Sequence, residues 1–266
     1  DQGAKAGVNL ITISKLPILL PPLPEQQRIA QVLGDVDALI QKLEALIAKK
    51  RDIKQASMQE LLTGKRRLPG FSGAWETKRL GEVGQVVTGS TPKTDVPAYW
   101  GEGFPWITPT DINQKRDMVS SERTVTRKGL QVIRELPANT VLVTCIASIG
   151  KNAILRAKGA CNQQINAIIP STSYSPEFLY YTIENSKSYL QSNAGTTATS
   201  IISKTTFFEL VFIFPPLPEQ AAIAQVLSDM DAELEKLEAR LAKTRDLKAG
   251  LMGELLTGRI RLRVAN

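Results

Sequence analysis

Apolar residues recur at steps of three and four in two long stretches of the chain, which is the spacing of a helix with one apolar face. Charged residues fill most of the other positions, so each stretch predicts a long amphipathic helix whose seam needs an apolar partner. The seam positions are Leu33, Val36, Ile40, Leu43 and Ile47 in the first helix and Leu227, Met230, Leu234, Leu237 and Leu241 in the second.

The two helices belong to an internal repeat. Residues 21–68 and 215–262 both begin with PPLPEQ and run through LLTG, and 31 of the 48 aligned positions are identical without a gap. Proline suits a first helical turn, and the glycine of LLTG suits a left-handed cap at the helix end. We expect the two copies to fold back on each other as an antiparallel coiled-coil stalk. Two separate amphipathic helices on one globule are the alternative.

Residues 69–214, between the helices, have a different pattern. Glycine and proline turns are dense, and a helix is predicted over 175–193. Short runs typical of β-strands lie between the turns, at 85–88, 141–146, 165–169 and 210–214. The pattern predicts one mixed α/β domain, so the fold class is α/β with two long helices.

The first residues form an incomplete piece. Residues 11–26 are similar to residues 205–220, so we interpret 1–20 as the end of a truncated copy of the middle domain whose body is missing. Either the chain is a fragment of a protein with two such domains, or it is a half-length form that completes itself as a homodimer. Residues 263–266 form a tail.

Composition excludes several classes of function. There is no histidine, which removes histidine-based nucleophiles, histidine acid–base catalysis and mixed zinc sites. Cys145 and Cys161 are too few for a zinc site of cysteines alone, and without a secretion signal we expect two reduced thiols in a cytoplasmic protein. No phosphate-binding loop, dinucleotide fingerprint or membrane-length apolar run is present. We therefore expect no catalytic site, cofactor or metal, and the net charge of +7 is compatible with a nucleic-acid partner.

Polar loops of the middle domain carry the candidate nucleic-acid contacts. Small hydroxyls and cations on glycine-rich turns can meet phosphates, and amides and cations can meet base edges. The candidates are Ser90, Thr91, Lys93, Thr94, Thr108, Thr110, Asn113, Gln114, Lys115, Arg116, Ser148, Lys151, Asn152, Asn162, Gln163, Gln164, Thr196 and Thr197.

Structural alternatives stay open for these loops. The glycine–proline loop at 89–92 is equally typical of an ordinary turn, and the amides at 162–164 could form a structural network. Three acids, Asp111, Asp117 and Glu122, could be imagined as a metal cluster, but solvated loop acids are the simpler interpretation. The three tryptophans are more typical of packing than of base stacking.

Four stretches carry a resemblance to a known family. They are LGEVGQVVTGSTPKTDVPAYWGEGFPWITPTDI (80–112), VLVTCIASIGKNAILRAKGACNQQINAIIP (141–170), GTTATSIIS (195–203) and the two PPLPEQ–LLTG helices. Together they resemble the specificity (S) subunit of type I restriction–modification enzymes. One departure is that this subunit has two complete recognition domains, whereas here only one is present.

The resemblance implies that residues 69–214 are a target-recognition domain that reads part of a site on double-stranded DNA. It also implies that the two helices set the domain spacing and dock methyltransferase (modification) subunits, and through them restriction (motor-nuclease) subunits. The chain itself would then be non-catalytic, since the methyl donor, ATP and magnesium belong to those partners. The alternative is a coiled-coil decoy that binds the modification subunit without reading DNA.

Overall fold

The structure is a computed structural model that describes residues 13–15, 18, 20–113, 115–195 and 200–262. Its contacts divide the chain into a helical unit, residues 1–52 with 232–266, and a globular unit, Ile53–Asp231. The division falls inside the two long helices. The globular unit is therefore wider than the domain expected at 69–214, because it takes in the last turns of the first helix and the first turns of the second.

The two long helices are α2 (Leu23–Leu61) and α8 (Leu217–Leu255), each of 39 residues. Both copies of the repeat begin and end in the same way. At each start a glutamine side chain donates to the carbonyl oxygen of the proline five residues earlier, Gln26 at 2.7 Å and Gln220 at 2.8 Å. Past each end, Gly64 and Gly258 have φ of +71° and +73°, which is the left-handed cap expected from the sequence.

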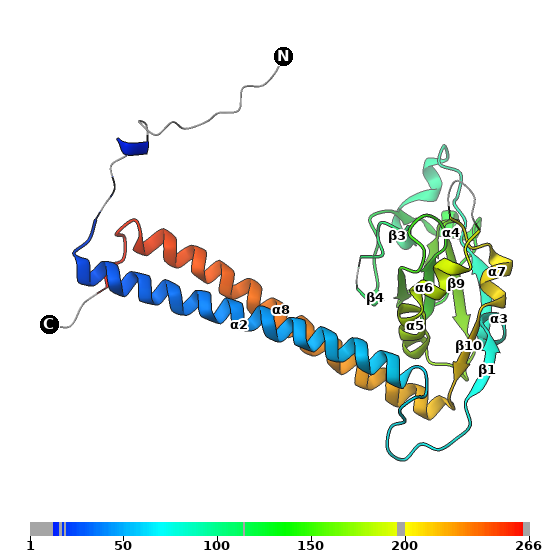
Figure 1. Cartoon of the computed structure of the whole chain (residues 1–266). Helices are drawn as coiled ribbons and strands as arrows, with labels where there is room; N and C mark the ends of the chain where they lie inside the picture. The colour runs from blue at the N-terminus through cyan, green and yellow to red at the C-terminus, as the bar shows by residue number, and fades with distance from the viewer. Residues whose placement is uncertain (1–12, 16–17, 19, 114, 196–199, 263–266) are drawn as a thin grey trace. The chain divides into compact units, whose positions relative to one another are not determined.

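Within the helical unit, α2 and α8 run antiparallel and side by side (Figure 1). Four ion pairs join their described residues, and Asp37 and Glu44 of α2 pair with later residues of α8 than Lys50 and Arg51 do. The pairs are Asp37–Lys248, Glu44–Arg245, Lys50–Glu233 and Arg51–Glu238. This pairing confirms the antiparallel helix pair and excludes two separate helices.

The predicted seam lies between the helices. In the helical unit Leu43, Ile47 and Leu234 are at least nine-tenths buried, as is Leu227 in the globular unit. The other seam positions are half-buried: Leu33, Val36, Ile40, Met230, Leu237 and Leu241. Apolar burial along one face of each helix, with ion pairs outside it, is the packing of a coiled coil.

The globular unit contains three small sheets. The largest has the strand order β2-β9-β6-β7-β4, and all its neighbours are antiparallel except the parallel pair β4 and β7. Its strands are β2 (Gly84–Thr88), β9 (Ile165–Pro170), β6 (Thr140–Thr144), β7 (Asn152–Leu155) and β4 (Asp117–Met118). The second sheet is β5 (Thr124–Val125), β3 (Trp100–Ile107) and β8 (Ala160–Cys161), and the third is β1 (Glu76–Arg79) with β10 (Val211–Phe214).

Short helices cover the sheets and complete the core. They are α3 (Leu80–Val83), α4 (Arg127–Gln131), α5 (Pro176–Asn185), α6 (Lys187–Ser192), α7 (Lys204–Glu209) and the 3-10 turn η1 (Pro97–Tyr99). The side chains of Phe178, Tyr181 and Phe207 are fully buried against the β6 and β9 strands and the ends of the long helices. The helix predicted over 175–193 is therefore two helices, because Ser186 leaves the helical conformation between α5 and α6.

One strand that the sequence concealed is β3. It contains Gly101, Gly103 and Pro105, which favour a turn when read alone. Both glycines have positive φ, and the register shifts between Trp100 and Phe104, so they form an irregularity inside the strand. A Cβ on Gly103 would lie 2.5 Å from the carbonyl oxygen of Val125, so glycine lets β3 approach β5.

The two cysteines are free and buried in the globular unit. Burial raises the pKa of Cys145 to about 11 and that of Cys161 to about 12, which keeps both thiols protonated at neutral pH. Among the described residues, no helix is both long enough and apolar enough to cross a membrane.

Candidate nucleic-acid interface

A hollow of about 480 Å³, lined by both polar and apolar side chains, opens on the surface of the globular unit, where loops after β3 and β6 meet the segment after β8. Five of the predicted DNA contacts line it: Thr108, Thr110, Ser148, Asn162 and Gln164. The rest of its lining is Trp106, Pro109, Asp111, Glu122, Arg123, Ile146 and Ala147. Residues separated by more than 50 positions in the sequence thus share one surface.

Asp111 holds the loop that follows β3 in shape. Its Oδ2 accepts from the backbone N–H of Thr108 at 2.8 Å and from the Thr108 hydroxyl at 2.6 Å, while its Oδ1 accepts from the N–H of Glu122 at 2.8 Å. The Thr108 and Thr110 hydroxyls lie 2.7 Å apart at the rim. Asp111 is therefore a structural acceptor, and among the described residues no group of acids and cysteines is placed to hold a metal ion.

The amides after β8 are oriented by one another. The backbone N–H of Gln164 donates to Asn162 Oδ1 at 3.1 Å, so Asn162 Nδ2 is left to donate to Gln164 Oε1 at 3.0 Å. A backbone N–H can only donate, which fixes both amide orientations and leaves Gln164 Nε2 free of a protein partner in the described chain. Gln163 lies outside the hollow and accepts from the Thr91 hydroxyl at 2.5 Å. The expected amide network is present, and it leaves one free amide donor on Gln164, a residue that lines the hollow.

The glycine–proline loop packs against residues that line the hollow. A Cβ on Gly89 would lie 2.1 Å from the carbonyl oxygen of Asn162, so only glycine lets the two loops meet. The Ser90 carbonyl accepts from Trp106 Nε1 at 2.9 Å, and its hydroxyl accepts from the N–H of Arg134 at 2.8 Å. Ser90 is thus engaged in holding the loop, while Lys93 and Thr94 are exposed.

Asn152 does not fit the predicted role. It lies in β7 with 5% of its surface exposed, and its Nδ2 donates to the carbonyl oxygen of Tyr180 at 2.7 Å. A buried amide that is hydrogen-bonded to α5 cannot contact DNA, so the prediction of Asn152 as a DNA contact is wrong. Its neighbour Lys151 is exposed.

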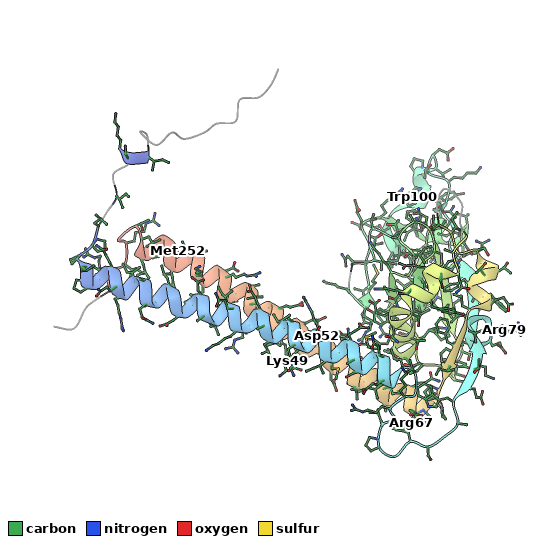
Figure 2. The ribbon with its side chains drawn as sticks, in the orientation of Figure 1. Lys49, Asp52, Arg67, Arg79, Trp100 and Met252 are labelled. Atoms are coloured by element: carbon green, nitrogen blue, oxygen red, sulfur yellow. The ribbon has the colours of Figure 1, made fainter. Side chains whose placement is uncertain are left out.

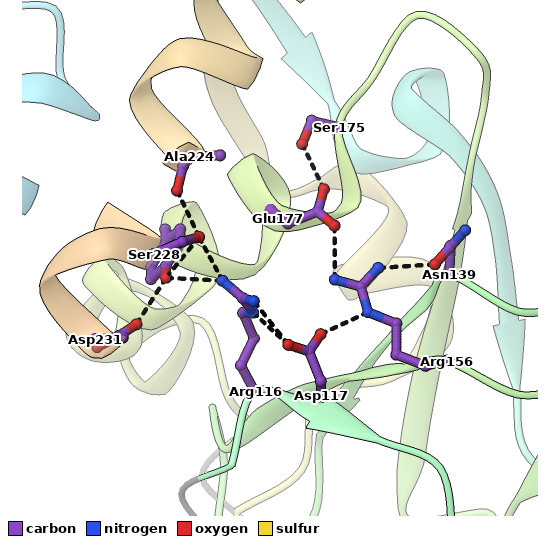
Figure 3. A network of polar contacts seen from close by, with 10 residues as sticks. Arg116, Asp117, Asn139, Arg156, Ser175, Glu177, Ala224, Ser228 and Asp231 are labelled. Carbon is purple, nitrogen blue, oxygen red and sulfur yellow. Dashed lines mark hydrogen bonds and ion pairs between the residues drawn. The ribbon is translucent and has the colours of Figure 1, made fainter. Parts of the chain in front are cut away.

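Arg116 is also placed differently from the prediction (Figure 3). Its guanidinium donates to Asp117 at 2.7 and 2.9 Å, to the Tyr181 hydroxyl at 3.1 Å and to the Ser228 hydroxyl at 2.5 Å. These partners lie on β4, α5 and the first turns of α8, so Arg116 joins three elements of the globular unit. Its donors are committed within the protein, whereas Asn113 and Lys115 beside it are exposed.

Asp117 links Arg116 to a second arginine. Arg156 donates to Asp117 Oδ1 at 2.5 Å and to Glu177 Oε1 at 2.6 Å (Figure 3). Burial alone would raise the pKa of Asp117, but the hydrogen bonds from Arg116 and Arg156 outweigh it and hold that pKa below its ordinary value. Burial and the Arg156 hydrogen bond oppose each other in the same way at Glu177, whose pKa is also lowered.

Arg123 was missed by the sequence reasoning. Its guanidinium carbon lies 3.8 Å from the ring centroid of Trp100 and 5.2 Å from that of Trp106, at the edge of the hollow. Trp100 lies at the end of the globular unit away from Arg67 (Figure 2). No sequence signal could have identified Arg123, because it stands in a loop between two-residue strands and meets the tryptophans only through the fold.

Three other candidates, Gln114, Thr196 and Thr197, lie outside the described residues.

Comparison with known families adds to this geometry. The family model for the type I restriction modification DNA specificity domain matches residues 2–50 and 73–243, which is most of the chain. The chain belongs to this specificity-domain family. The match takes in both the helix pair and the lining of the hollow.

Curated relatives of this specificity-domain chain are themselves specificity subunits. It is 35% identical over 167 residues to the type I restriction enzyme MjaIX specificity subunit of Methanocaldococcus jannaschii, and the aligned region covers 60% of this chain and 39% of that protein. It is 32% identical over 195 residues to the HindI specificity subunit of Haemophilus influenzae, covering 70% of this chain and 42% of that one. The chain thus spans about two fifths of the length of these relatives.

Solved structures share the fold of this specificity-domain chain. A chain from a structure on complex assembly and conformational transition of the type I R-M system superposes with a TM-score of 0.62 at 20% identity, covering 89% of this chain and 60% of that one. The type I restriction-modification S subunit from M. genitalium gives 0.60 at 15% identity, covering 88% and 61%. At these identities the likeness supports the α/β domain with paired long helices, and the fold alone.

Proposed function

We propose that the chain reads DNA sequence as the specificity component of a type I restriction–modification complex. The observation that carries this proposal is the hollow, where hydroxyl and amide side chains from three separate loops converge in a member of the specificity-domain family. Such groups bond to base edges and phosphates. In this proposal residues 69–214 form the target-recognition domain, and the helices of 21–68 and 215–262 are the spacer.

The helix pair is proposed to dock the modification subunits, and through them the restriction subunits. In support, Leu39 and Leu46 stand seven residues apart on α2 with 38% and 39% of their surface exposed, outside the seam that faces α8. Exposed apolar residues at heptad spacing are typical of a face that packs against another helix. The repeat has Glu233 and Arg240 at the matching positions of α8, so we expect α2 to supply this docking face.

The test is equilibrium binding of the chain to a pool of random-sequence duplexes, with and without its modification subunit, followed by sequencing of the bound DNA. We expect sequence-selective binding that tightens when the modification subunit is present. Gln164→Ala in the hollow should lower selectivity, while Gln191→Ala, an exposed glutamine on α6 outside the hollow, should leave it unchanged.

The outcomes separate the proposal from its alternative. A chain that binds the modification subunit but enriches no DNA sequence, alone or in the complex, is the coiled-coil decoy, and the DNA-reading proposal fails. Replacement of both Leu39 and Leu46 by glutamate should weaken capture of the modification subunit. Undiminished capture would contradict the docking face on α2 and leave DNA reading standing.

A further inference from the structure

Arg123 is an exposed cation at the edge of the hollow, and its side chain has no hydrogen-bonding partner among the described residues. Among the described residues that line the hollow it is the one cation, and two acids, Asp111 and Glu122, line it as well. Its five N–H groups make no hydrogen bond or ion pair with the described chain, and its contacts are the two indole rings. Its donors are therefore available to a ligand in the hollow.

The two indole rings that hold Arg123 are themselves fixed. Trp100 and Trp106 meet edge to face, with centroids 5.0 Å apart and an interplanar angle of 89°. Their Nε1 atoms donate to the Lys93 carbonyl at 3.1 Å and the Ser90 carbonyl at 2.9 Å. A guanidinium stacked on a rigid ring keeps its planar edge free and loses little entropy when that edge bonds.

The charge of the lining indicates what kind of ligand fits. The lining contains two carboxylates and one guanidinium, so its net charge is negative. Asp111 accepts hydrogen bonds from Thr108 and from the N–H of Glu122, but these bonds do not remove its negative charge. A phosphate would meet net repulsion here, whereas the edge of a base is uncharged. Two adjacent acceptors in one plane match a guanidinium fork, and in the major groove guanine offers that pair as O6 and N7.

We propose that Arg123 determines specificity by reading one guanine of the target through its O6 and N7 atoms. This inference rests on the proposed DNA-reading function and names the base that the hollow accepts. The edge-to-face tryptophans position the guanidinium, and the hydroxyls of Thr108 and Thr110 line the same hollow.

The experiment uses the full chain in complex with its modification subunit. The target sequence is first obtained by sequencing duplexes selected from a random pool. Binding is then measured on that duplex and on duplexes in which each guanine in turn is replaced by 7-deazaguanine, which lacks the N7 acceptor. For the wild type we expect one guanine whose replacement weakens binding about 5-fold, the lower end of the range of a bidentate base contact, because the O6 acceptor remains.

Variants then assign that guanine to Arg123. Arg123→Ala should lose the preference at that position and show no further loss on 7-deazaguanine. Arg123→Lys keeps a positive charge near Trp100 but removes the paired N–H donors of the guanidinium. This variant should therefore lose most of the preference for guanine at that position while remaining folded. Arg127→Ala, which removes an exposed arginine outside the hollow, is the matched control and should keep the wild-type pattern. Thermal unfolding of each variant checks that the domain is intact.

Each contrary outcome has a distinct meaning. If Arg123→Ala loses the same affinity for all DNA sequences and its binding depends less on salt, then Arg123 contacts a phosphate. That result overturns the guanine assignment. An unchanged preference in both Arg123 variants also overturns it, with DNA reading intact. If the wild-type complex selects no sequence, the proposed function fails and this inference fails with it.

Discussion

Lys115 and Arg116 are neighbouring cations with different surroundings. Lys115 is exposed and its side chain makes no hydrogen bond or ion pair with the described residues, whereas Arg116 is bonded to Asp117, Tyr181 and Ser228. A free surface cation can neutralise a DNA phosphate at no structural cost. A cation with three internal partners stabilises the fold, because removing it leaves those partners unpaired.

We predict opposite effects for the two alanine variants. Lys115→Ala should weaken DNA binding and reduce the slope of log affinity against log salt by about 0.9, with unchanged thermal unfolding. Arg116→Ala should lower the free energy of unfolding by about 1.5–3 kcal/mol, the range for hydrogen bonds to charged groups. Urea titration and duplex binding at several salt concentrations measure both. Equal stability of the two variants would contradict the network in Figure 3.

The lowered pKa of Asp117 predicts that the stability of the fold depends on pH. Its pKa is lowered in the folded protein, because hydrogen bonds from Arg116 and Arg156 overcome the opposing effect of burial. A depressed folded pKa stabilises the fold above the unfolded value of about 3.9, and this stabilisation is lost as pH falls through the folded pKa. Asp117→Asn should therefore be less stable than the wild type at pH 7, and the difference should shrink below about pH 4. Urea unfolding at both pH values measures it, and a constant difference would exclude a titrating role.

At the scale of elements, the long helices follow from local signals repeated in both copies. The PPLPEQ starts are held by Gln26 and Gln220, and the ends by left-handed Gly64 and Gly258, so a few residues of each copy determine its limits. The strands at 85–88, 141–146, 165–169 and 210–214 also appear within a residue or two, since their β-branched runs are continuous. β3 was not predicted, because its glycines are explained only by the neighbouring strand that they approach.

Two adjacent positions of α2 give a matched test of the helix pair. Ile47 has 4% of its surface exposed in the seam, whereas Leu46 has 39% exposed. Ile47→Ala should cost about 2–4 kcal/mol of stability, and Leu46→Ala less than about 1 kcal/mol. Thermal unfolding followed by circular dichroism measures both. Similar destabilisation by the two changes would indicate that the helices do not pair through the predicted seam.

At the scale of the molecule, charge limits how the chain alone can hold DNA. Residues 69–214 contain 14 Lys and Arg against 11 Asp and Glu, and several of these cations are in ion pairs, among them Arg79, Arg156 and Lys158. Few cations remain to neutralise phosphates. Tight DNA binding is therefore expected only in the proposed complex with modification subunits.

The expected salt dependence follows from that count. With about three phosphates neutralised, the affinity of the isolated chain for duplex DNA should fall roughly 50-fold between 50 and 200 mM salt. Fluorescence anisotropy with a labelled duplex measures the slope. A slope near zero would mean that phosphate contacts do not drive binding, and a slope near that of a strongly basic repressor would mean that the helical unit also contacts DNA.

The sequence by itself determined the two helices, their caps, their antiparallel partnership and most of the long strands. These features depend on periodicity and on residues close together in the chain, and the repeat doubled the signal. Only the tertiary structure decided which polar side chains are free. Asn152 and Arg116 are of the right type to bind DNA, yet the fold buries one against α5 and ties the other to α8, while it places Arg123 over two tryptophans at the hollow. A side chain's partners lie tens of residues away along the chain, so residue type alone leaves its role open until the fold brings them together.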